Sequence, residues 1–147
     1  MKVIAIGNRL MRDDAIALSV GEKIEEELKK HRIELIFGET DFIYCISNIK
    51  EEDFIVILDS SFYGVEPGEI TITSINSSKK NTKSYTQHSF SIVDLIRLHY
   101  PKIKGYIITI EIAEIEMSLG ISETLNEELD TISKKVLEEI LKLKILS

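Results

Sequence analysis

Residues 2–17, with the sequence KVIAIGNRLMRDDAIA, decide how this chain folds. They begin with a continuous apolar run from Val3 to Ile6, which is typical of a buried strand in a parallel sheet. A short polar loop and two adjacent acids, Asp13 and Asp14, come next, and an amphipathic segment begins directly after them. The unit therefore joins a strand to a helix through an acidic loop, and open α/β sheets bind their ligands at such junctions.

The acidic pair has two interpretations. An acid at a helix start accepts bonds from free backbone N–H groups and lies at the positive end of the helix dipole. One acid is sufficient for that purpose, so the second is available for a functional role. The residues alone leave both interpretations open.

The bulk composition restricts the possible classes of protein. A length of 147 residues predicts one domain over residues 1–147. The formal net charge of -7 disfavours binding to nucleic acid, because phosphate groups need clustered Lys and Arg. Cys45 is the single cysteine, which excludes an intramolecular disulfide and a CxxC metal site. No apolar run resembles a signal peptide or a membrane span, so we expect a cytoplasmic protein that does not bind membranes.

The remaining chain alternates between strand-like and helix-like patterns. Apolar residues recur at three- and four-residue spacing in the expected helices, and the strands are short apolar or alternating runs. The expected strands are 33–37, 54–58, 69–75 and 105–112, and the expected helices are 14–30, 41–49, 89–99 and 122–144, with a mobile polar loop at 76–87. This order predicts a three-layer α/β/α fold, with a central mostly parallel twisted sheet and helices on both faces.

Two further residues have positions that suit a site. Asp59 directly follows the most apolar strand, although a turn-forming Asp is the simple alternative. His88 precedes the helix for which Ser89 is the expected N-cap, and an ordinary surface histidine is its alternative. If strands 3–6 and 54–58 are neighbours, Asp14 and Asp59 meet at one edge of the sheet, and His88 can join them.

The sequence favours metal chemistry over the other common kinds of site. No glycine-rich phosphate loop follows Gly7, no GxSxG elbow is present, and nothing indicates that Cys45 is activated. Two carboxylates and one imidazole form a mixed oxygen and nitrogen set that suits zinc, nickel, manganese or iron. The ligand types alone do not select among these metals.

Several motifs, in order along the whole chain, resemble the maturation endopeptidases of nickel–iron hydrogenases. GNRLMRDDAIA is similar to the opening signature of that family, in which a glycine–asparagine pair precedes two acids. Further matches are the Gly38-Glu39-Thr40 turn, the strand IVILDSS ending around Asp59, the Pro67-Gly68 turn, the loop YTQHS with His88, and the segments Ile110–Ile112 and Gly120–Ser122. Where many family members have glycine, this chain has Ala15 and Ala17, and Phe37 replaces an acid found in some of them.

The resemblance implies roles for individual residues. Asp14 and Asp59 are implied as catalytic residues that also bind metal, together with His88 as the third metal ligand. Gly38 and Thr40 are assigned to substrate binding through the matching turn, and Asp13 to shaping its loop.

The implied activity is an aspartate- and metal-dependent endopeptidase. Family members remove a C-terminal extension from the nickel-loaded large subunit of the hydrogenase, so the expected partner is that precursor. The substrate supplies the nickel, and we expect no permanently bound metal, although cadmium or zinc could substitute in crystals. We also expect a monomer.

Two mechanisms and two rival functions remain open at this point. The metal can polarise the scissile carbonyl or activate water, or it can only position the chain while a carboxylate acts as general base. One rival is a recognition or assembly protein that binds a hydrogenase-type partner without cutting it. The other is a general metallohydrolase with its own zinc, which would normally contain an HExxH-like pair that this chain lacks.

Overall fold

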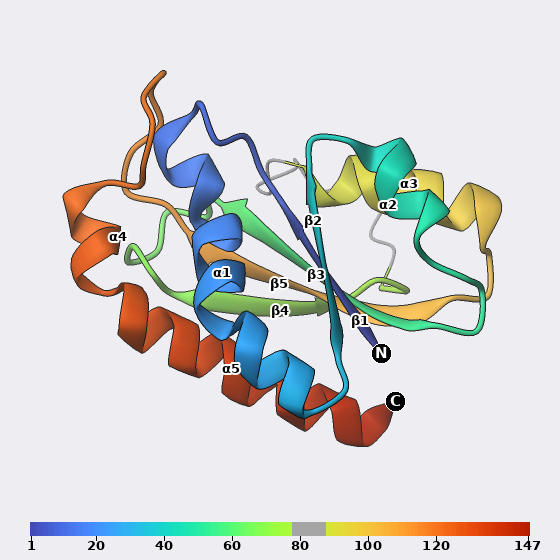
Figure 1. Ribbon diagram of the computed structural model, residues 1–147. Helices are drawn as coiled ribbons and strands as arrows, with labels where there is room; N and C mark the ends of the chain where they lie inside the picture. The colour runs from blue at the N-terminus through green and yellow to red at the C-terminus, as the bar shows by residue number, and fades with distance from the viewer. Residues whose placement is uncertain (78–87) are drawn as a thin grey trace.

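Five strands form one sheet in the order β2-β1-β3-β5-β4, as a computed structural model describes for residues 1–77 and 88–147 (Figure 1). The first four strands in this order are parallel, and β4 pairs antiparallel with β5 at one edge. The strands are β1 (Lys2–Ile6), β2 (Glu34–Glu39), β3 (Phe54–Ser61), β4 (Ile70–Ser74) and β5 (Lys104–Glu111). The predicted mostly parallel sheet is confirmed.

Helices cover both faces of the sheet. On one face α1 (Ile16–Lys30), which follows a 3-10 turn η1 (Arg12–Ala15), packs beside α5 (Leu129–Leu146). On the other face α2 (Phe42–Ser47) lies beside α3 (Ser89–His99). The short α4 (Glu123–Glu127) precedes α5, and its Leu125 belongs to the core under α1 and α5. Figure 1 shows the two helical layers on opposite sides of the strands, as the alternating sequence pattern predicted.

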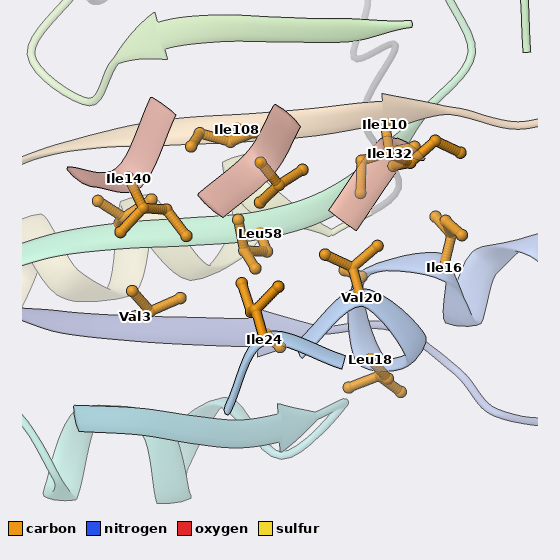
Figure 2. Packing of buried hydrophobic residues seen from close by; sticks show 14 of the residues in the cluster. Val3, Ile16, Leu18, Val20, Ile24, Leu58, Ile108, Ile110, Ile132 and Ile140 are labelled. Atoms are coloured by element: carbon orange, nitrogen blue, oxygen red, sulfur yellow. The ribbon is translucent and has the colours of Figure 1, made fainter. Parts of the chain in front are cut away.

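The apolar strand residues divide between two cores. Successive side chains of a strand point to opposite faces of its sheet. Val3 and Val56 therefore pack under α1 and α5, whereas Ile4 and Ile57 pack under α2 and α3, all four fully buried. Figure 2 shows the first of these cores, where residues such as Val20, Leu58 and Ile140 meet between the sheet and its helices. Burial on both faces explains why these strands are continuously apolar.

Two of the expected elements differ most from those observed. β3 does not end at Leu58 but continues through Asp59 to Ser61, because these residues keep their pairing with β5. The predicted helix 122–144 is divided at Glu128 into α4 and α5, although Ser122 caps its start as expected. Most of the predicted loop 76–87 lies outside the described residues.

Gly7 allows β1 to approach the turn that follows it. Its φ is +148°, and a Cβ atom there would lie 2.2 Å from the carbonyl oxygen of Asp14. A side chain at this position would therefore displace the turn η1 from the end of the strand.

Among the described residues, none of the helices combines the length and hydrophobicity needed to cross a membrane.

Candidate functional site

Asp14, Asp59 and His88 come together at the carboxyl end of the sheet. Asp14 lies in η1 after β1, Asp59 lies near the end of β3, and His88 directly precedes α3. One ligand atom from each residue lies within 4.8 Å of the other two. β1 and β3 are parallel neighbours, so the segments that follow them begin at the same edge, which is why the three residues can meet.

His88 and Asp14 form the central contact of the cluster. The ring Nε2 of His88 lies 2.8 Å from Asp14 Oδ2, which also accepts a 2.8 Å bond from the backbone N–H of Asn8. Burial acts to raise the pKa of Asp14, but the bonds from His88, Asn8 and Ser60 outweigh it and hold that pKa below its usual value. The bond to Asp14 raises the pKa of His88 despite its partial burial. Both shifts favour the charged forms of the pair, a carboxylate on Asp14 and a protonated ring on His88.

Asp59 is fully buried and holds the start of α3. Its Oδ2 accepts bonds from the backbone N–H groups of His88 and Ser89, at 2.9 and 2.8 Å, and from the Ser89 hydroxyl at 2.8 Å. Its Oδ1 accepts a 2.8 Å bond from the N–H of Ser60. Burial raises the pKa of Asp59, although these bonds oppose the shift. The prediction that Ser89 is the N-cap is wrong: His88 occupies that position without a side-chain bond, and a carboxylate from β3 satisfies the free N–H groups.

Two contacts at the cluster were missed by reading the sequence. The Ser60 hydroxyl donates a 2.8 Å bond to Asp14 Oδ1, and both residues are buried. The ring of Phe42 lies edge-on to His88, with 6.2 Å between the ring centroids. The polar run of residues 59–61 at the end of an apolar strand was the available signal for Ser60. Phe42 gave no comparable signal, because its contact depends on how α2 packs against α3.

Asp13 has a different role from its neighbour. Its fully buried carboxylate accepts bonds from the N–H groups of Ala113, Glu114 and Ser122, at 3.0, 2.7 and 2.6 Å, and from the Ser122 hydroxyl at 2.9 Å. It thereby fixes both ends of the loop between β5 and α4. The interpretation of Asp13 as a loop-shaping residue agrees with these contacts. Neither acid caps the helix that follows, because the N-caps of η1 and α1 make no side-chain bond, so that interpretation of the pair is wrong.

Gly38 and Thr40 lie outside the three-residue cluster, at the end of β2. Gly38 is buried, and a Cβ there would lie 2.2 Å from Cys45 Sγ, whereas Thr40 is exposed. Burial raises the pKa of the Cys45 thiol to about 11. A thiol in that state is a poor nucleophile, so Cys45 acts as a small packing residue, as its sequence context indicated.

The donor set fits a transition-metal ion. Nitrogen and oxygen ligands lie about 2.0–2.2 Å from such an ion, so two ligand atoms on one ion are at most about 4.4 Å apart. The 4.8 Å spread therefore requires only a small closure of the cluster. Three ligands leave coordination positions open for a substrate or for water. Binding through Nε2 would require that nitrogen to be unprotonated and to exchange its contact with Asp14 for the ion.

The comparisons with known proteins agree with this fold. Residues 18–141 match the family described as hydrogenase maturation protease, a segment that contains Asp59 and His88 but not Asp14. A hydrogenase expression/formation protein, HupD of Thiocapsa roseopersicina, is 28% identical over 67 residues, which cover 45% of this chain and 30% of that protein. The matched part thus spans less than a third of this relative's length.

Solved structures are similar over nearly the whole chain. The hydrogenase maturation protease HybD from Thermococcus kodakarensis has a TM-score of 0.75 at 21% identity, covering 95% of this chain and 99% of that one. The maturating endopeptidase HybD from E. coli has a TM-score of 0.71 at 19% identity, covering 97% and 93%. At these identities the structures show a shared fold, and the family match covers most of the sequence. The chain therefore belongs to the hydrogenase maturation protease family.

Proposed function

We propose that this chain is a cytoplasmic, monomeric endopeptidase that removes a C-terminal extension from the nickel-loaded large-subunit precursor of a nickel–iron hydrogenase. The observation that carries the proposal is the convergence of Asp14, Asp59 and His88 in a chain of this family. Their three ligand atoms form an open set that can accept an ion already bound by another protein. Residues 1–147 act as one domain in this proposal.

The nickel belongs to the substrate rather than to the enzyme. Asp14, Asp59 and His88 supply oxygen and nitrogen ligands, and the precursor supplies the remaining ones. None of the three is a thiolate, and all three are engaged in hydrogen bonds within the chain. We therefore propose weak metal affinity in the isolated protein, with cadmium or zinc able to take the place of nickel in crystals. The shared ion then positions the scissile peptide, which supplies the specificity.

The geometry favours Asp14 over Asp59 as the general base. Both oxygens of Asp59 accept bonds, and most of these hold the start of α3. The lowered pKa of Asp14 keeps it ionised, and its Oδ2 faces the partly exposed ring of His88. When His88 turns toward the ion, Oδ2 keeps its bond from the Asn8 N–H, and the lone pair that faced His88 can accept a proton from the attacking water. Asp59 then acts as a ligand and orients His88, while Gly38 and Thr40 contact the substrate chain.

Incubation with a nickel-loaded precursor tests the proposal. The wild type should release the C-terminal peptide, identified by product mass, and should leave the nickel-free precursor and casein uncut. His88→Ala should abolish cleavage with an unchanged circular dichroism spectrum. His99→Ala is the matched control, because His99 is exposed on the same helix and lies outside the cluster.

The outcomes separate the candidate functions. Equal processing of loaded and nickel-free precursor would contradict the role given to nickel. Tight binding of the loaded precursor without cleavage would favour the recognition or assembly protein instead. Cleavage of casein would indicate a general metallohydrolase.

A further inference from the structure

Exposed apolar side chains gather at the end of the sheet that carries the site. Among the described residues, most of the exposed large hydrophobic ones lie on segments that follow the carboxyl ends of strands. Single exposed apolar residues are ordinary, but such a concentration on one edge marks an interaction surface. We use the term apolar rim for five of them, which lie on the segments after β1, β3 and β5: Leu10, Phe62, Val65, Met117 and Leu119.

The segments after β1 and β5 form a projecting tip. Met11 and Ser118 pair as an isolated parallel bridge, in which Ser118 donates to the carbonyl of Leu10 at 2.9 Å and Arg12 donates to the carbonyl of Ser118 at 3.0 Å. Figure 1 shows the two segments leaving the sheet together at its upper left. Met117 is 87% exposed and Leu119 is 75% exposed, so the tip presents apolar side chains to solvent.

The tip is fixed to the site by the acidic pair. Asp13 holds the N–H groups of Ala113, Glu114 and Ser122, which lie at the two ends of the segment that carries Met117. The adjacent Asp14 holds the N–H of Asn8, two residues before Leu10. The apolar tip and the metal-binding carboxylate are therefore parts of one connected structure.

A second buried carboxylate fixes the segment after β3 in the same way. Glu111 accepts bonds from the N–H groups of Tyr63, Gly64 and Val65, at 2.9, 2.8 and 3.1 Å, and a weaker bond from the hydroxyl of Ser61. This segment begins three residues after Asp59 and exposes Phe62 by 60%. Surface loops that are fixed in advance lose little entropy when a partner binds.

We infer that the apolar rim is the docking surface for the body of the large-subunit precursor, an inference that rests on the proposed function. Leu10 lies two residues after Asn8, which bonds to Asp14, and Phe62 lies three residues after Asp59. A precursor that places a peptide bond at Asp14 and His88 would therefore cover the rim. Apolar contact supplies affinity that three metal ligands alone do not provide. A second copy of this chain fits less well, because two copies that each carry a net charge of -7 repel one another.

Steady-state cleavage by tip variants tests the inference. Met117→Ser with Leu119→Ser should raise KM for the nickel-loaded precursor by about tenfold, as expected when well-packed interface side chains are removed. kcat should stay within about twofold of the wild-type value, because a docking contact that is equal in the ground state and the transition state changes KM alone. The matched control is Leu98→Ser, because Leu98 is 77% exposed near the end of α3 remote from His88. Its KM should not change.

Binding measurements distinguish a failure of docking from a failure of the proposed function. Immobilised precursor should bind His88→Ala, and addition of the two tip substitutions should weaken that binding by a similar factor. A wild type that binds through the rim without cutting would refute the peptidase and leave the docking surface intact. Unchanged KM and binding in the tip variant would overturn the docking inference. A wild-type dimer that the same substitutions convert to a monomer would also overturn it, because the rim would then join two copies.

Discussion

Asp13 and Asp14 are neighbours in the sequence, yet their carboxylates contact different parts of the molecule. Asp13 binds the N–H groups of a loop a hundred residues further along the chain, whereas Asp14 faces His88 and Ser60. The same chemical group thus stabilises the fold at one position and forms part of the site at the next. This division gives two predictions for single residues.

Asp13→Asn should lower the free energy of unfolding by about 1–3 kcal/mol, because an amide nitrogen would face buried N–H donors. Asp14→Asn should abolish cleavage and change stability less, since Asp14 binds fewer backbone groups. Urea denaturation of both variants measures the difference. Equal stability of the two would contradict the assignment of Asp13 to the fold.

Metal binding should weaken as the pH falls through the raised pKa of His88, because a protonated imidazole cannot be a ligand. Asp14→Asn removes the main cause of that rise, so it should lower the pKa of His88. NMR titration of the His88 ring in both proteins checks the direction. An unchanged His88 titration in Asp14→Asn would contradict the contact between the two side chains.

The raised pKa of His88 also affects stability. The ion pair stabilises the fold below the unfolded-state pKa of His88, and this contribution is lost as the pH rises through the folded-state pKa.

At the scale of elements, β3 and α3 are joined by Asp59. The strand supplies the carboxylate that caps the helix, and His88 is the N-cap residue directly before that helix. The position of the histidine is therefore set by a strand that lies far from it in the sequence. Loss of the carboxylate should disturb both elements.

Asp59→Asn should cost about 1–3 kcal/mol of stability, because its amide would point a donor at N–H groups of α3 or Ser60. Ile57→Ala, two residues earlier on the same strand, should cost about 2–5 kcal/mol through the cavity that it leaves. Thermal and urea unfolding of both variants give the comparison. A fully stable Asp59→Asn would show that the cap contributes little and that Asp59 serves function alone.

At the scale of the whole molecule, the two apolar cores lie between the sheet and its helices, and the candidate site lies at the carboxyl edge. The fold therefore does not require a metal ion to fill its interior. We therefore expect stability to depend little on metal binding.

Nickel at micromolar concentration should leave the melting temperature of the isolated protein unchanged. A ligand stabilises the folded state by RT ln(1 + [L]/Kd), which is close to zero when the affinity is weak. Scanning calorimetry with and without nickel, repeated on His88→Ala, measures this effect. A rise of several degrees in the wild type that is absent from His88→Ala would show that the protein holds a metal of its own.

Local patterns in the sequence were sufficient to predict the fold class, most of the helices and strands, and the three residues of the candidate cluster. Apolar periodicity is a local property, and the carboxyl ends of strands can be found from it, so Asp14 and Asp59 could be selected as candidates. His88 was selected in the same way, from its place before an expected helix. The family resemblance rested on motifs that are equally local.

The hydrogen-bond partners of each buried carboxylate could be identified only in the folded structure. Asp59 with α3, Asp13 with the segment 113–122 and Glu111 with the segment 63–65 are all contacts between distant parts of the chain. Nothing near Glu111 in the sequence indicates a buried clamp. The physical reason is that a buried carboxylate must find donors wherever the packing of strands and loops leaves backbone N–H groups unpaired, and that packing is set by the whole sheet.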